Sequence, residues 1–91
     1  MSDINHTLQE RGARYGDFRY NARIAQEIKI TMRRGLRWDA LQPDMKEALD
    51  QIACKISRLL SGDPAYPDNW HDISGYATLV AQTLKSEDDD A

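Results

Sequence analysis

The chain has 91 residues, of which 41% are hydrophobic and 30% are charged, with a net charge of −3 and a single cysteine. This composition is that of a soluble globular protein and excludes a disordered chain, and the length suits one helical domain over residues 1–91. No apolar run approaches the roughly 20 residues of a membrane-spanning helix, and the first residues contain no apolar signal core. We therefore expect a cytoplasmic protein that does not contact a membrane.

The charges are unevenly distributed along the chain. Residues 1–40 carry eight Lys or Arg against five Asp or Glu, whereas residues 41–91 carry four against ten. A basic first half could contact phosphate groups, or it could pair with the acidic second half. We prefer the pairing, because nucleic-acid-binding domains usually have a net basic charge, and we do not expect a nucleic-acid partner.

Residues 1–17 are polar and mixed, and we expect them to be only partly ordered. A first helix is predicted over residues 18–34, because apolar residues recur there at spacings of three and four. Ile30 falls on the opposite side and would be exposed in a monomer. Gly35 can end this helix. The apolar positions of the helix are Phe18, Ala22, Ala25, Ile28 and Met32.

The clearest helix is the second, over residues 43–60, which begins with a proline suited to the first helical position. Its apolar stripe contains Met45, Ala48, Leu49, Ile52, Ala53, Ile56, Leu59 and Leu60. After a loop with two prolines, a third helix is predicted over residues 68–84, with Asp68 as its cap. Its core side contains Trp70, Ile73, Ala77, Val80 and Leu84. Residues 85–91 read as an acidic, frayed tail.

No strand pattern is present, so the predicted fold is all-α. Short links between the helices favour a three-helix antiparallel bundle. Small size and the position of Ile30 suggest that a second copy completes the bundle as a homodimer. We expect Trp70 to be buried at the corner between the second and third helices.

The sequence contains no nucleophile motif, phosphate-binding glycine loop or Cys/His metal pattern, so we assign no catalytic residue. Two carboxylate pairs remain, Glu47 with Asp50 and Asp68 with Asp72, and grouped carboxylates suit Mg²⁺. In an antiparallel hairpin, however, Asp72 lies level with Lys55 and Arg58 and about 9 Å along the axis from the level of Asp50. We therefore prefer an ion pair for Asp72 over a metal site.

Two further features are candidates for ligand or partner binding. The segment "ERGARYGDF" gathers Arg11, Arg14 and Tyr15, which can bind a phosphate and stack a base, or pair with the acidic helices. The pairing is preferred. Gly75 lies on one side of the third helix with Asp72 and Leu79, and a glycine in a helix suggests a close approach. Contact with another helix is preferred there over a nucleotide groove.

The stretches "ERGARYGDF", "ALDQIACKISRLLSGDP" and "DNWHDISGYATLV" together resemble a family of small uncharacterised phage and prophage proteins, over about residues 9–84. They also look like domains found beside phage nucleotide-modification enzymes and, more loosely, like MazG-type all-α NTP pyrophosphohydrolases. That likeness implies Mg²⁺ held by an E-x-x-E pair and an E-x-x-D pair, which map to Glu47–Asp50 and Asp68–Asp72. Here an aspartate replaces the second glutamate, and the last pair is spaced by four.

The sequence thus predicts a helical module that binds a nucleotide, another phosphorylated ligand, or a phage or host protein, and the resemblance implies that the module is prophage-encoded. Binding is expected at the corner formed by Lys55, Arg58 and Asp72, without a cofactor. The alternative is a Mg²⁺-dependent nucleotide pyrophosphohydrolase that uses the two carboxylate pairs.

Overall fold

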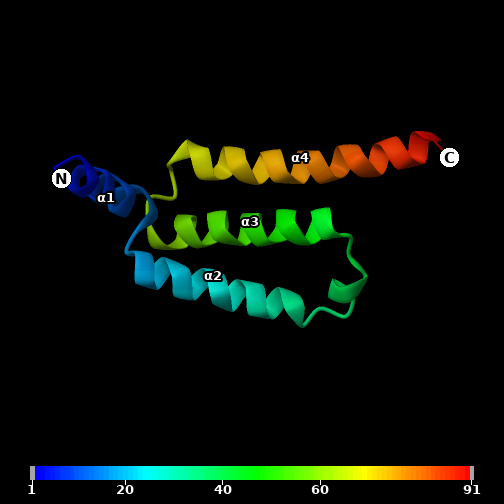
Figure 1. Ribbon diagram of the computed structural model, residues 1–91, viewed down its shortest axis with the longest axis horizontal. Coiled ribbons are helices and arrows are strands. Elements are labelled where there is room, and N and C mark those ends of the chain that lie inside the picture. Colours follow the sequence, from blue (N-terminus) through cyan, green and yellow to red (C-terminus); the bar gives the residue numbers. More distant parts are fainter. Residues whose placement is uncertain (1, 91) are drawn as a thin grey trace.

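The computed structural model describes residues 2–90, with the side chains of residues 3–85, and the described chain is all-α without a strand, as predicted. Four α-helices and one short 3-10 helix follow one another along the chain (Figure 1). They are α1 (Ser2–Tyr15), α2 (Phe18–Arg33), η1 (Trp38–Ala40), α3 (Pro43–Ser61) and α4 (Pro67–Asp90).

The first helix, α1, occupies the segment that was expected to be only partly ordered. Contacts from distant residues hold its C-terminal end: Ser61 Oγ donates to Tyr15 O at 2.6 Å, and Asp63 N donates to Arg14 O at 2.8 Å. No local pattern reveals such contacts. The predicted frayed tail is also helical, since α4 continues to Asp90, and Ala91 lies outside the described residues.

Local sequence signals explain where the remaining helices begin. Asp17 caps α2 by accepting a hydrogen bond from Tyr20 N at 3.0 Å, as N-cap carboxylates do. Gly16 between α1 and α2 has a φ of 84°, a conformation that favours glycine. Pro43 and Pro67 open α3 and α4, at a position where their missing N–H groups cost nothing.

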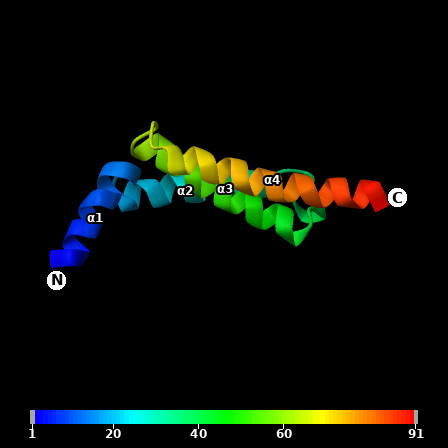
Figure 2. The same ribbon diagram turned by 90° about the horizontal axis from the view of Figure 1, so that it is seen from above.

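The three longest helices lie side by side, with α3 in the middle and antiparallel to both neighbours (Figure 1). Helix α3 packs on α2 along one side and on α4 along the other, and in residues 2–90 α2 and α4 scarcely contact each other. The arrangement is a layer with two open faces instead of a closed three-helix bundle. Helix α1 turns away from this layer at one end (Figure 2).

The contacts of α3 identify its two open faces. Ser57 is directed toward α2, where its Oγ donates to Asn21 Oδ1 at 2.5 Å, and Lys55 is directed toward α4, where it pairs with Asp72. At 100° per residue, Leu49, Ile56 and Leu60 fall between these two sides on one face, and Cys54 and Arg58 fall on the other. On α4, Trp70, Ala77 and Leu84 lie on the side away from Asp72 and continue the first face. We call these six residues the apolar face.

The apolar face corrects the predicted core. Trp70, expected to be buried, is 56% exposed, and Leu60 is 64% exposed. In a layer each helix buries only the narrow edges that touch its neighbours, so the fully buried apolar residues of the described chain are small: Ala25, Ala48 and Ala53. The other predicted core residues that are exposed are Phe18, Leu49, Ala77 and Leu84. Ile30 is exposed, as predicted.

Candidate functional site

A groove of about 530 Å³ opens between α1, α2 and α3, on the opposite side of the layer from the apolar face. Three cationic side chains line it, together with one tyrosine, one exposed phenylalanine and a single carboxylate. These residues are Arg11, Lys29, Arg58, Tyr15, Phe18 and Asp17. We call this hollow the α1–α3 groove, and its volume is that of a small-molecule site.

The ring of Tyr15 lies between two guanidinium groups in this groove. Arg58 lies 4.4 Å and Arg11 lies 5.0 Å from the ring centroid, both within the range of a cation–π contact. Neither arginine forms an ion pair with a described residue. The preferred prediction, that Arg11 pairs with the acidic helices, is therefore wrong for the described chain, and both guanidinium groups keep their donors available to an anion.

A partly buried hydrogen-bond network fixes Tyr15 in place. Its carbonyl oxygen accepts from Asn21 Nδ2 at 3.2 Å and from Ser61 Oγ at 2.6 Å. Ser57, which is fully buried, donates to Asn21 Oδ1 and thereby orients the amide. Satisfied buried polar networks of this kind rigidify their surroundings, so the groove wall at Tyr15 is held from two helices.

Two glycines allow α1 to approach α3 closely enough to form the groove. A Cβ atom on Gly62 would overlap Arg14 O and lie 2.5 Å from the Tyr15 backbone, and a Cβ on Gly16 would overlap Ser61 O. Only hydrogen atoms fit between these backbones. Arg14 and Tyr15 are the last residues of α1, at the point where α1 contacts the end of α3. The two glycines therefore determine where the ring of Tyr15 lies in the groove.

Arg14 lies outside the groove, against a second tyrosine. Its guanidinium is 4.9 Å from the ring centroid of Tyr66, which meets Tyr15 edge to face at 6.2 Å. The Tyr66 hydroxyl donates to Asp68 Oδ2 at 3.0 Å, and this hydrogen bond, with a smaller contribution from burial, raises the pKa of Tyr66. Of the two arginines in "ERGARYGDF", only Arg11 lines the groove, while Arg14 contacts Tyr66, which in turn packs against Tyr15.

The predicted corner of Lys55, Arg58 and Asp72 is divided between two places. Lys55 Nζ pairs with Asp72 Oδ2 at 3.2 Å, which is the ion pair that the helix levels predicted for Asp72. Arg58 instead joins the groove, because three residues along a helix rotate it away from α4. A Cβ atom added to Gly75 would have no neighbouring atom within 4 Å, so no other part of the described chain makes the close approach suggested for this glycine.

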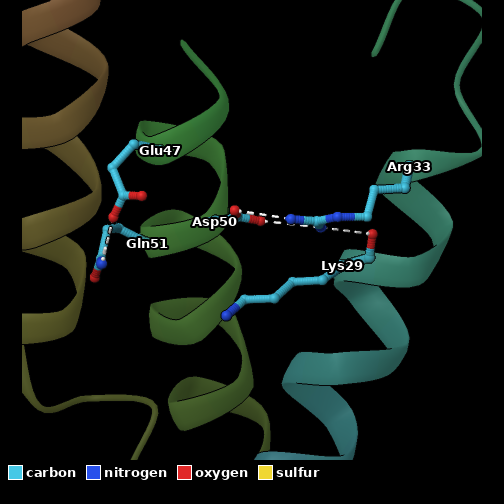
Figure 3. Close-up of polar contacts among 5 residues, drawn as sticks. All are labelled: Lys29, Arg33, Glu47, Asp50 and Gln51. Atoms are coloured by element: carbon cyan, nitrogen blue, oxygen red, sulfur yellow. Dashed lines mark hydrogen bonds and ion pairs between the residues drawn. The ribbon is translucent and has the colours of Figure 1, made fainter. Parts of the chain in front are cut away.

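The four predicted metal ligands lie in four separate contacts. Arg33 holds Asp50 with two hydrogen bonds of 3.1 and 2.9 Å, and Figure 3 shows Asp50 directed toward α2 while Glu47 turns the other way. Glu47 accepts from Gln51 at 2.9 Å. Asp68 and Asp72 have the partners given above. Among the described residues, no three histidine, cysteine, aspartate or glutamate side chains are grouped as metal ligands.

The sequence reasoning missed Lys29 and Phe18 as groove residues, although a signal was present. Both share one side of α2 with Ala22 and Ala25, at helical spacing, and this side was interpreted as core.

Comparison with family models, with curated proteins and with solved structures returned no match. The resemblance to phage proteins accordingly stays a prediction. Within residues 2–90, no helix has the length and apolar character needed to cross a membrane.

Proposed function

We propose that this protein is a binding module for a small phosphorylated ligand that carries a flat ring, such as a nucleotide, in the α1–α3 groove. The observation that supports the proposal is the pair of guanidinium groups of Arg11 and Arg58 on the ring of Tyr15, without a carboxylate partner in the described chain. Arginine is suited to this role because its planar fork donates two parallel hydrogen bonds to phosphate oxygens.

The other groove residues fit the same ligand. Lys29 adds a third positive charge on α2, and the exposed ring of Phe18 offers an apolar surface at the mouth of the groove. Aromatic rings stack on nucleotide bases, with a contribution of about 1–3 kcal/mol per base in known cases. Three cations against the single carboxylate of Asp17 favour an anion over a neutral ligand.

The test is a titration with AMP, ADP, ATP and inorganic pyrophosphate, by calorimetry at low ionic strength. Arg58→Gln should weaken binding by roughly tenfold to a hundredfold, because a charge-assisted hydrogen bond is lost. Arg37→Gln is the matched control, since Arg37 is exposed and does not line the groove. The proposal fails if none of the four compounds binds, or if the two variants bind alike.

The enzymatic alternative, a Mg²⁺-dependent pyrophosphohydrolase, requires Glu47, Asp50, Asp68 and Asp72 to converge on metal ions. Their four separate contacts favour the binding module over this alternative. Pyrophosphate release from any NTP in the presence of Mg²⁺ would favour the enzyme instead. A phage or host protein as the ligand, a prophage origin and a cytoplasmic location remain proposals that rest on the sequence.

We also propose that the chain works as a homodimer, as its small size suggests. The open apolar face of the layer supports this proposal, because a second copy could cover it.

A further inference from the structure

The apolar face extends over two neighbouring helices, α3 and α4. It contains Leu49, Ile56 and Leu60 from α3 and Trp70, Ala77 and Leu84 from α4, and none of these side chains is charged. Four of the six are large hydrophobic residues with substantial exposure. Soluble monomers rarely expose a contiguous apolar surface made of several large side chains, and such surfaces mark interaction sites.

The total surface of the chain supports the same conclusion. The accessible surface is 6835 Å², whereas a folded monomer of 10.4 kDa is expected to expose about 5,400 Å². Helix α1 and the end of α4 project from the layer and contribute to this excess (Figures 1 and 2). The excess of about 1,400 Å² is larger than the roughly 800 Å² that each partner buries in a standard interface, so the chain exposes enough surface to form one.

We propose that a second copy of this chain covers the apolar face. In this dimer, α3 and α4 of one protomer pack on α3 and α4 of the other, so that Trp70 and Leu60 enter a shared core. A two-fold axis allows this because the same uncharged surface meets itself, without like charges in opposition. The three-helix layer thereby becomes half of a two-layer helical domain.

The small core of the monomer favours a second copy of the chain over another partner on the apolar face. The fully buried apolar residues in the described chain are three alanines, so the monomer lacks the core that a small domain needs. A second copy would supply that core with the large side chains of the apolar face.

The proposal also places the two ligand grooves. Because each α1–α3 groove lies on the opposite side of the layer from the apolar face, both grooves stay open on the outside of the dimer. Dimer formation and groove binding are therefore separable, and this inference does not depend on the proposed function. A variant that breaks the dimer should retain the contacts of Tyr15 with Arg11 and Arg58.

The experiment is sedimentation velocity of the full chain from about 1 to 100 µM, since dimer formation depends on protomer concentration. The wild type should sediment at about twice the mass of the 10.4 kDa chain. Leu60→Asp should raise the dimer dissociation constant by roughly tenfold to a hundredfold. Leu49→Asp is a second variant in case the first does not fold, and circular dichroism checks the helical content of both.

The matched control is Leu79→Asp, because Leu79 is 62% exposed, close to the 64% of Leu60, but lies on the opposite face with Asp72 and Gly75. This variant should dimerise like the wild type. In a Trp38→Phe background, the fluorescence of Trp70 should shift to shorter wavelength as the dimer forms. A wild type that stays monomeric at the highest concentration would overturn the proposal, as would folded Leu60→Asp and Leu49→Asp proteins that dimerise normally, or a Leu79→Asp protein that dissociates.

Discussion

Replacing Gly62 by alanine should strongly destabilise this protein, although the change adds only one methyl group. The added Cβ atom would overlap the carbonyl oxygen of Arg14 and lie 2.5 Å from the backbone of Tyr15, and backbone atoms cannot yield as a flexible side chain can. The end of α1 must therefore move away from α3. That movement breaks two hydrogen bonds, from Asp63 N to Arg14 O and from Ser61 Oγ to Tyr15 O.

The magnitude follows from these two effects. Overpacking a tight contact costs about 1–3 kcal/mol. Each lost hydrogen bond costs about 0.5–1.5 kcal/mol. The free energy of unfolding should thus fall by about 2–6 kcal/mol, which lowers the melting temperature of a domain of this size by roughly 10–30 °C. Because Tyr15 forms a wall of the groove, the same variant should also lose nucleotide binding.

The assay is thermal and urea unfolding followed by circular dichroism at one fixed protein concentration. Gly12→Ala and Gly75→Ala are the controls, since both residues lie within helices and no atom lies within 4 Å of either added Cβ. Alanine should raise the free energy of unfolding by about 0.5–1 kcal/mol at each. A Gly62→Ala protein as stable as the wild type would refute this reasoning about the crossing of α1 and α3. A destabilised Gly75→Ala protein would show that something outside the chain packs there.

Two further predictions concern Asp72 and Tyr66. Asp72→Asn should lower the free energy of unfolding by about 1 kcal/mol, because it leaves the Lys55 side chain, which is 12% exposed, without its partner. The value is modest because the Asp72 side chain is 43% exposed. Mg²⁺ should not change the wild-type melting temperature, and a gain in stability from both the substitution and Mg²⁺ would indicate a metal site instead. Asp68→Asn should lower the pKa of Tyr66, because the hydrogen bond to the Asp68 carboxylate raises this pKa. The stability that this bond contributes is present below the unfolded pKa near 10 and is lost as the pH rises through the higher folded pKa. An absorbance titration of the Tyr66 phenolate that is unchanged in the variant would contradict the assignment.

The sequence by itself determined the helical class and, to within a residue, the starts of α2, α3 and α4, because those depend on neighbouring residues. Asp68, predicted to cap the last helix, lies instead in the first turn of α4, which begins at Pro67. Asp17 caps α2 through an N–H three residues away, and Pro43 and Pro67 begin helices through their own backbone geometry. The level of Asp72 beside Lys55 was also predictable, since it follows from helix rise and a short loop.

Only the tertiary structure decided how the helices are arranged and what their faces meet. Periodicity shows that Leu60 and Trp70 lie on apolar sides, but three apolar stripes can either close into a bundle or remain open in a layer, and periodicity is the same in both. Helix α1 depends on Ser61, which lies 46 residues from Tyr15 in sequence, so no local signal predicts it. The same long-range contact brings Tyr15 close to Arg58. The groove forms because the end of α1 and the end of α3, which lie in different halves of the sequence, meet at Gly16 and Gly62.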